Sequence, residues 1–120
     1  MPKLLIALLS AAVLLVGVAG CSATEPLTVS ADTVIIDVRT PAEYDAGHLD
    51  GAVNIDVSSA DFATEIATLS ADGDYIVYCQ SGNRSAQAVS LMREQGFKNV
   101  RDAGGISSAA ETTGISIVTS

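Results

Sequence analysis

After residue 30, short apolar runs alternate with more polar segments along the chain. Residues 34–38 read Val-Ile-Ile-Asp-Val and residues 75–78 read Tyr-Ile-Val-Tyr. Runs rich in β-branched and aromatic residues are typical of buried strands, so both segments are predicted to be strands. Shorter runs predict three more strands, over 52–55, 99–101 and 115–118, the last of them at a sheet edge.

Helices are predicted in the polar stretches between these strands. Thr40-Pro41-Ala42-Glu43 has the pattern of a capping box with proline at the first helical position, and the short helix that it starts should end by Gly47. A second helix is predicted after a cap at Ser58 or Ser59, with Phe62, Ile66 and Leu69 on its apolar face. A third should run from about Ser85 to Gln95 and end at Gly96. A weak fourth helix should follow a turn at Gly104-Gly105.

Strands that alternate with helices predict an α/β fold with a central parallel sheet covered by helices on both faces. About ninety residues are enough for one such domain, which we place at 31–120. Ligands of such sheets bind at the carboxyl ends of the strands. Cys79 directly follows the predicted strand 75–78, so it lies where a reactive group is expected.

The first twenty residues have the layout of a secretory signal rather than of a folded element. Lys3 supplies a positive start, residues 4–16 are apolar except for one serine, and small residues precede Cys21. Val18-Ala19-Gly20-Cys21 resembles the bacterial lipobox, whose cysteine receives lipid. That resemblance implies a signal peptide over 1–20, a diacylglyceryl group on Cys21, a tether over 21–30 and an extracytoplasmic, membrane-anchored location. Ordinary secretion and an uncleaved N-terminal anchor are the alternatives.

Composition narrows the possible partners and the role of the cysteines. The chain has 14 acidic and 6 basic residues, a net charge of −8, which argues against nucleic-acid binding because phosphates require Lys and Arg.

There are two cysteines, Cys21 and Cys79. If Cys21 carries lipid, Cys79 has no partner within the chain. An unpaired thiol in an oxidising compartment raises the expectation that Cys79 is reactive.

The segment 79–85 reads Cys-Gln-Ser-Gly-Asn-Arg-Ser, in which a strand delivers a cysteine into a tight loop that leads to a helix. Amides of such a loop can form an anion-binding nest, and the helix start adds its positive dipole end. Arg84 contributes a permanent positive charge. These features favour the thiolate, so we predict a lowered pKa for Cys79. The competing interpretation is a buried, inert cysteine at a strand end.

Two separate blocks of the chain resemble the rhodanese family. The loop from Cys79 to Ser85 is similar to the active-site loop of single-domain rhodaneses. A second block, in the expected order, comprises Asp37-Val38-Arg39, Glu43-Tyr44 and the segment 47–55, which reads GHLDGAVNI. The resemblance covers about residues 29–118 and implies a rhodanese-like, three-layer α/β fold.

The resemblance also implies a sulfurtransferase activity. The family's nucleophile corresponds to Cys79, which would take the sulfane sulfur of a small anionic donor such as thiosulfate and hold it as a persulfide. The acceptor would be cyanide in the test tube and a thiol or a protein in the cell. No metal and no organic cofactor is implied. The family's substrate-cradling loop corresponds to residues Gln80, Ser81, Gly82, Asn83 and Arg84.

Three alternative functions remain open at this point. Related phosphatases also use a Cys–Arg loop, but with five intervening residues, whereas four lie between Cys79 and Arg84. A shorter loop makes a smaller cradle, which suits a sulfur atom better than a phosphate. Rhodanese-like domains also serve as binding modules, often after loss of the cysteine. Cys79 could instead cycle through oxidised states with the help of a partner thiol.

Several other polar residues are predicted to be structural. His48 should bond to backbone, Asp37 and Arg39 should form an ion pair that holds a turn, and Glu43 should cap a helix. Tyr75 and Tyr78 should lie in the core. The chain departs from the family after Gly104-Gly105, because it has no Trp and reads Ile-Ser-Ser-Ala-Ala over 106–110. The packing of the last helix is expected to differ accordingly.

Overall fold

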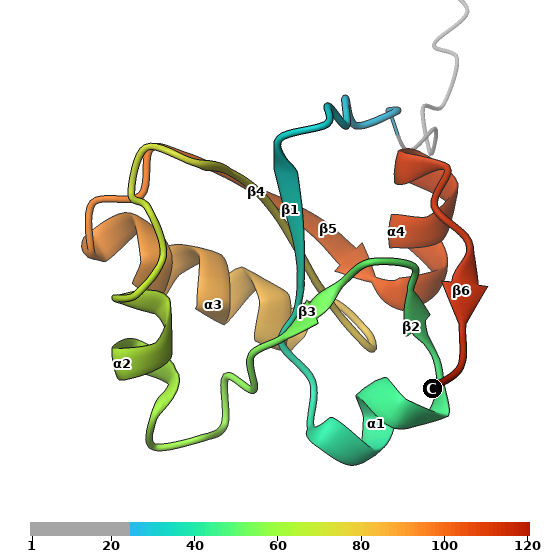
Figure 1. Cartoon of the computed structure of the whole chain (residues 1–120), viewed down its shortest axis with the longest axis horizontal. Coiled ribbons are helices and arrows are strands. Elements are labelled where there is room, and N and C mark those ends of the chain that lie inside the picture. The colour runs from blue at the N-terminus through green and yellow to red at the C-terminus, as the bar shows by residue number, and fades with distance from the viewer. Residues whose placement is uncertain (1–24) are drawn as a thin grey trace, which may run out of the picture.

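Four parallel strands form the centre of the computed structural model, which describes residues 25–120 (Figure 1). Their order across the sheet is β3-β1-β4-β5, with β1 and β4 in the middle. The register pairs Ile36 of β1 with Val53 of β3 on one side and with Val77 of β4 on the other. These strands are β1 (Thr33–Asp37), β3 (Val53–Asn54), β4 (Asp74–Cys79) and β5 (Asn99–Gly105).

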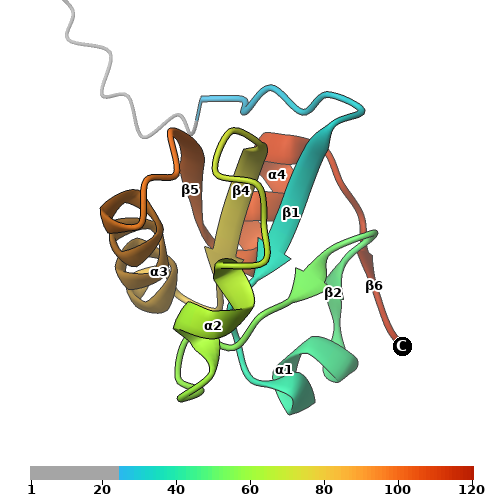
Figure 2. The same ribbon diagram turned by 60° about the vertical axis from the view of Figure 1, so that its left-hand side comes forward.

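The remaining elements surround this sheet, and α1 lies beyond the carboxyl end of β1 (Figures 1 and 2). They are α1 (Pro41–Ala46), α2 (Phe62–Ile66), α3 (Asn83–Glu94), α4 (Ile106–Thr113) and two short strands, β2 (His48–Leu49) and β6 (Ile117–Val118). Helices α2 and α3 cover one face, and α4 covers the other. The predicted three-layer α/β fold with a central parallel sheet is therefore confirmed.

Side chains alternate between the two faces along each central strand, as the two-residue period of a strand requires. Ile36 and Val77 pack in the cluster under α2 and α3, whereas their neighbours Ile35 and Ile76 pack in the cluster under α4. Cys79 belongs to the α2 and α3 side. Because both faces are covered, the central strands can be apolar at nearly every position.

The predicted capping box at the start of α1 is present. Thr40 Oγ1 accepts a hydrogen bond from the Glu43 amide, and the Glu43 carboxylate accepts one from the Thr40 amide, both at 3.3 Å. Pro41 occupies the first helical position. The box satisfies two amides that the helix itself leaves unpaired, which explains why a helix of six residues forms here.

Three predictions for the second half of the fold were wrong in detail. The strand predicted over 99–101 continues to Gly105, with an irregularity opposite Val77 and Tyr78, so Gly104-Gly105 ends a strand rather than forming a turn. The strand predicted over 115–118 pairs antiparallel with β2 in a separate two-stranded sheet, and β2 itself was not predicted. α2 begins after Asp61 without a side-chain cap and ends at Ile66, before Leu69.

The last helix packs without the aromatic residue that the family often has. α4 buries Ile106, Ala109 and Thr112 against the sheet. Leu27, which falls in the predicted tether, packs against the same cluster and donates its amide to the Thr112 carbonyl at 2.8 Å. The start of the described chain therefore helps to cover α4.

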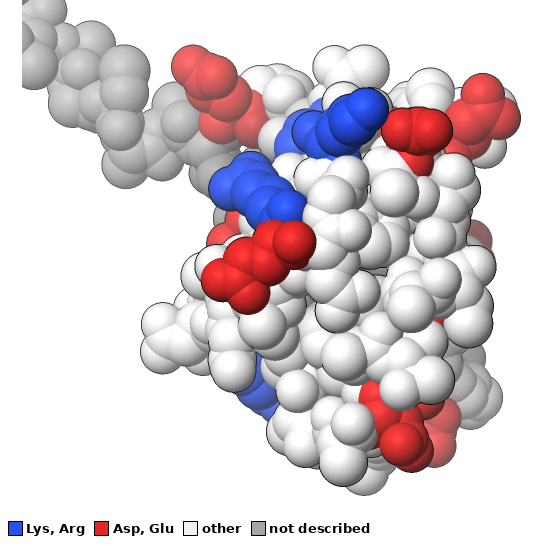
Figure 3. All heavy atoms as spheres, turned by 90° about the vertical axis from the view of Figure 1, so that its left-hand side faces the viewer, with Lys and Arg blue, Asp and Glu red and all other residues white. Residues whose placement is uncertain are grey.

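Charged side chains lie mainly at the edges of the face that α2 and α3 present (Figure 3). Both signs occur there, and the middle of the face is uncharged, so this face offers no continuous basic surface of the kind that nucleic-acid backbones require. Within residues 25–120, none of the helices combines the length and the apolarity needed to cross a membrane. The predicted signal peptide and Cys21 lie outside the described residues.

Candidate active site

β4 carries Cys79 to the carboxyl end of the sheet, at the position predicted for a reactive group. Its residues from Tyr75 to Cys79 are buried, and Cys79 has no exposed surface. Cys79 pairs with Gly105 of the neighbouring strand β5. The sulfur therefore lies on a rigid element, between the sheet and the start of α3.

The loop after Cys79 turns back on the sulfur through Gly82. Gly82 has a φ of 104°, a left-handed conformation that favours glycine, and it immediately precedes α3. This conformation directs the Gly82 amide to Cys79 Sγ at 2.9 Å. The amides of Ser81 and Ser85 also act on the sulfur, so part of the predicted nest is present.

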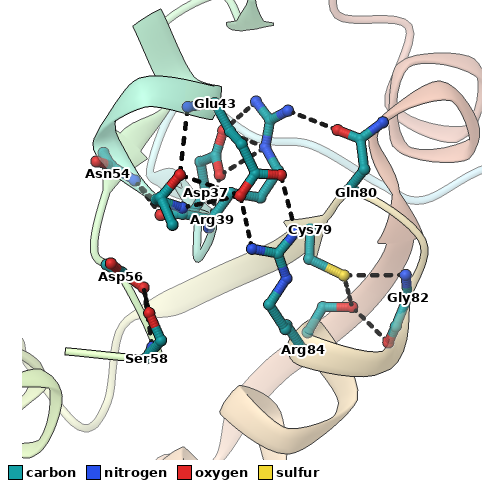
Figure 4. Close-up of polar contacts among 12 residues, drawn as sticks. Asp37, Arg39, Glu43, Asn54, Asp56, Ser58, Cys79, Gln80, Gly82 and Arg84 are labelled. Atoms are coloured by element: carbon teal, nitrogen blue, oxygen red, sulfur yellow. Dashed lines mark hydrogen bonds and ion pairs between the residues drawn. The ribbon is translucent and has the colours of Figure 1, made fainter.

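Ser85 adds a buried hydroxyl next to the sulfur. Its Oγ lies 3.4 Å from Cys79 Sγ and donates to the Gly82 carbonyl at 3.0 Å (Figure 4). A hydroxyl has one proton, so in the thiol form the Cys79 S–H donates to Ser85. When Cys79 ionises, Ser85 can turn its proton from the carbonyl to the sulfur. Ser85 thus positions the loop and can stabilise the sulfur in either protonation state.

Two opposing effects act on the pKa of Cys79. Burial disfavours the thiolate, and this is the largest single effect. Hydrogen bonds from the Ser85 hydroxyl and from the amides of Ser85, Gly82 and Ser81 stabilise the thiolate and together outweigh burial. The pKa of the Cys79 thiol is therefore lowered, in the direction that the sequence predicted.

Replacing Ser85 by alanine should raise the pKa of Cys79, because the thiolate loses its only side-chain donor among these contacts. Below that pKa, alkylation of Cys79 by iodoacetamide should slow by roughly tenfold, as expected for a lost hydrogen bond to a charged group. Above it, the rates of variant and wild type should converge. Ser90→Ala, at an exposed position of the same helix, is the matched control. Equal pH profiles for Ser85→Ala and wild type would contradict the assignment.

Arg84 is placed differently from the sequence expectation. Its Nη1 and Nη2 donate to the two carboxylate oxygens of Glu43 at 2.7 and 2.9 Å, and no hydrogen bond joins Arg84 to Cys79 Sγ. The guanidinium contributes to the site through charge, since Cys79 is among the groups that raise the pKa of Arg84. Glu43 thus pairs with Arg84 in addition to its predicted capping role.

The other loop residues do not all face the sulfur. The Gln80 side chain turns away and accepts a hydrogen bond from Arg39 Nη1 at 2.9 Å. Asn83 is the exposed first residue of α3. Of the five predicted substrate-binding residues, only Ser81 and Gly82 contribute amides to the sulfur, while Gln80 and Arg84 connect the loop to the rest of the site.

The predicted ion pair between Asp37 and Arg39 is present and buried. Arg39 Nε and Nη2 reach both Asp37 oxygens at 2.7–3.1 Å, and the side chains are 4% and 0% exposed. Arg39 also donates to the Gly47 carbonyl and to Gln80, so it links the turn after β1, the segment before β2 and the active-site loop. Asn54 holds the same turn by donating to the carbonyls of Asp37 and Arg39, a contact that sequence reasoning missed.

Gly105 was also missed as a determinant of the loop. A Cβ atom at this position would lie 2.7 Å from the Gln80 carbonyl oxygen, so only glycine permits the observed approach of the loop to β5. The Gly104-Gly105 pair was noticed in the sequence, but as a turn. The two glycines pair with Tyr78 and Cys79, so they help to position the loop that follows Cys79.

His48 contacts backbone, and Tyr75 and Tyr78 lie in the core, as predicted. His48 is buried, its Nδ1 lies 2.8 Å from the Tyr44 carbonyl oxygen, and its ring stacks on the Tyr44 ring. Tyr75 and Tyr78 are buried, and burial raises the pKa of Tyr78 above its usual range. Within residues 25–120, no group of three or more His, Cys, Asp or Glu side chains is arranged to hold a metal ion.

Comparison with known proteins places this geometry in a family. Residues 25–111 match the model of the rhodanese-like domain. The chain is 35% identical over 75 residues to the thiosulfate sulfurtransferase PspE of Escherichia coli K12, covering 62% of this chain and 72% of that protein. It is 41% identical over 68 residues to the thiosulfate sulfurtransferase GlpE of Pseudomonas entomophila, covering 56% of this chain and 60% of that one.

A solved structure agrees with these matches. A rhodanese with anions from Escherichia coli superposes with a TM-score of 0.61 and 30% identity, covering 73% of this chain and 99% of that chain. Some other relatives are longer; the match covers only 17% of a probable adenylyltransferase/sulfurtransferase, MoeZ, of Mycobacterium tuberculosis. By sequence and by fold, this chain belongs to the rhodanese-like domain family.

Proposed function

We propose that this protein is a sulfurtransferase that moves sulfane sulfur from thiosulfate, or a similar donor, to a thiophilic acceptor through a persulfide on Cys79. The observation that carries the proposal is the environment of the sulfur. Cys79 Sγ lies at the carboxyl end of β4, receives the Gly82 amide at 2.9 Å and contacts the Ser85 hydroxyl. The thiolate, not the thiol, attacks sulfur. Because the pKa of the Cys79 thiol is lowered, more of it is in this reactive form.

The reaction has two steps. In the first, the Cys79 thiolate attacks the outer sulfur of thiosulfate, the S–S bond of the donor breaks, and sulfite leaves with the bonding electron pair. In the second, an acceptor takes the outer sulfur and returns the Cys79 thiolate. The charge is conserved, because the persulfide has the single negative charge of the thiolate. The amides of Ser81, Gly82 and Ser85 would stabilise that charge in both forms.

The donor is expected to be a small anion, and the acceptor a thiol or a protein thiol in the cell and cyanide in an assay. Two relatives are named thiosulfate sulfurtransferases, and a related rhodanese was solved with anions. We assign the donor site to the loop residues Gln80, Ser81, Gly82, Asn83 and Arg84. The chemistry uses only the cysteine and the two substrates, so we propose no metal and no organic cofactor.

The test is the transfer of one sulfur atom from thiosulfate to the full chain. Intact-protein mass spectrometry should find the mass of one added sulfur after incubation with thiosulfate. Cyanide should remove it and release thiocyanate, which distinguishes a persulfide from an adduct of two oxygen atoms. Failure of a folded, reduced chain to take up sulfur would argue against thiosulfate as the donor.

A rhodanese-like binding or redox module without turnover is the second candidate. One observation favours it: Cys79 has no exposed surface, and no pocket opens onto it among residues 25–120. A donor could then reach the sulfur only after the loop moves. The same sulfur-transfer experiment separates the two functions, since a module without turnover would release no thiocyanate. A binding module would also keep its partner binding in Cys79→Ser, whereas a redox module would lose its activity.

We also propose that the protein is a lipoprotein on the extracytoplasmic side of a bacterial membrane, anchored through Cys21. The support is the sequence pattern over residues 1–21, which has the features of a signal peptide followed by a lipobox. Replacing Cys21 by serine should move the protein from the membrane fraction to the soluble fraction of cells that express the full chain. The measurement is immunoblotting after ultracentrifugation. Unchanged membrane partition of Cys21→Ser would favour an uncleaved apolar anchor instead.

A further inference from the structure

A bidentate ion pair joins the two motif blocks beside the candidate nucleophile. Arg84 Nη1 donates to Glu43 Oε1 at 2.7 Å, and Nη2 donates to Oε2 at 2.9 Å. Both terminal nitrogens of the guanidinium are therefore used by one carboxylate, in the strongest arrangement for this kind of pair. Figure 4 shows the guanidinium reaching toward α1, while the Cys79 sulfur points toward Gly82.

Glu43 is held in place from its other side. Its Oε1 also accepts from the Thr40 amide at 3.3 Å and from the Thr40 hydroxyl at 3.1 Å. The hydrogen bond from Arg84 is the main reason that the pKa of Glu43 falls to about 2, and the Thr40 bonds act in the same direction against partial burial. Glu43 is therefore charged at any pH at which the protein works, and it compensates the charge of Arg84.

This pair lies beside the sulfur, because Arg84 lies in the first turn of α3, just after the loop that follows Cys79 (Figure 4). The side chains of Arg84 and Glu43 are 33% and 31% exposed, so both charges face solvent next to the buried sulfur. The electrostatic attraction of a doubly charged donor to Arg84 is offset by its repulsion from Glu43. Because Coulomb energy is proportional to the charge of the donor, a dianion is affected twice as strongly as a monoanion.

We propose that Glu43 is a positioning residue that sets donor specificity: its carboxylate holds Arg84 away from the Cys79 sulfur and selects against doubly charged sulfur donors. The inference rests on the proposed function and goes beyond it, because it names the charge class of donor that the site prefers. Thiosulfate, the donor proposed above, is then still used, but with a lower kcat/KM than an unpaired Arg84 would give. A monoanionic or neutral donor is affected less.

The test is Glu43→Gln in the full chain, assayed with thiosulfate, a dianion, and with methanethiosulfonate, a monoanion. Both donors give the same Cys79 persulfide; the leaving groups are sulfite and methanesulfinate, each of which departs with the electron pair of the broken S–S bond. The kcat/KM for thiosulfate should rise on the order of tenfold, and that for methanethiosulfonate about threefold, the square root of the first gain. KM should carry most of both changes.

The substitution is suited to this question because glutamine keeps the length of the side chain and still serves as the third residue of a capping box. Loss of a partly exposed ion pair should also leave the fold intact. Asp45→Asn is the matched control, since Asp45 is exposed on the same helix and loses the same charge without touching Arg84. It should change either kcat/KM less than twofold. An unchanged or lower kcat/KM for thiosulfate in Glu43→Gln would overturn the proposal and show that Glu43 holds Arg84 in a productive position.

A second readout needs no turnover and keeps the two proposals distinguishable. Iodoacetate and iodoacetamide alkylate the same thiolate and differ mainly in charge. The ratio of their rates at Cys79 should rise severalfold in Glu43→Gln and stay constant in Asp45→Asn. If no donor yields a persulfide in wild type, the proposed function fails, and this ratio still decides whether Glu43 controls access of anions. A ratio that stays constant in Glu43→Gln would overturn the inference alone.

Discussion

Replacing Cys79 by serine should abolish thiocyanate formation from thiosulfate and cyanide, with kcat/KM at least roughly a thousandfold below that of the full wild-type chain. The serine hydroxyl does not ionise near neutral pH, and oxygen cannot replace sulfur as the carrier of a persulfide. The Gly82 amide at 2.9 Å and the Ser85 hydroxyl would surround a neutral oxygen instead of a thiolate. Intact mass should show no sulfur uptake by the variant.

The second cysteine of the chain provides the matched control. Cys21→Ser makes the same substitution at the proposed lipidation site and should leave sulfur uptake unchanged. Serine is close in shape to cysteine and finds hydrogen-bond partners at position 79, so the free energy of unfolding should change by no more than about 1–2 kcal/mol. Sulfur uptake that survives in Cys79→Ser and disappears in Cys21→Ser would show that Cys21, and not Cys79, carries the sulfur. Loss of activity accompanied by unfolding would leave Cys79→Ala as the decisive variant.

The fold could be predicted from sequence where its signals are local. The segments 34–38 and 75–78 are rich in β-branched and aromatic residues, and β1 and β4 lie there in the centre of the sheet. The capping box at Thr40 depends on residues three apart, so it is visible in sequence and present in the structure. The lowered pKa of Cys79 could also be predicted from sequence, because the hydrogen-bond donors that lower it lie within six residues of Cys79.

Features that depend on distant partners were not predictable in this way. β2 has two residues, too few to show a period, and it is a strand only because it pairs with β6. The strand over 115–118 was predicted, but its antiparallel pairing with β2 was not. The Arg84–Glu43 and Arg39–Gln80 contacts each join residues 41 positions apart. Sequence shows the charge of an arginine but not the carboxylate that it meets. Arg84 was therefore assigned to the anion, although Glu43 already holds it.

Removing the buried Arg39 side chain should destabilise the fold more than removing any partly exposed arginine. Arg39→Ala leaves the Asp37 carboxylate buried with the backbone amide of residue 39 as its remaining hydrogen-bond donor among these contacts. Breaking a buried pair in this way typically costs about 3–5 kcal/mol in the free energy of unfolding. Small domains are stable by only about 5–15 kcal/mol, so much of the stability should disappear. Urea denaturation followed by circular dichroism measures the loss.

The contrast with Arg101 makes this prediction specific to burial. Arg101 pairs with Asp74 at 3.1 Å, at the other end of the sheet, but the two side chains are 32% and 34% exposed. Arg101→Ala should therefore lower the free energy of unfolding by at most about 1 kcal/mol. Arg39→Lys should fall between the two variants, because lysine keeps the charge but cannot reach Asp37, Gln80 and the Gly47 carbonyl together. Equal losses in Arg39→Ala and Arg101→Ala would mean that the buried pair is no more important to the fold than a surface pair, and that the turn after β1 is held mainly by Asn54.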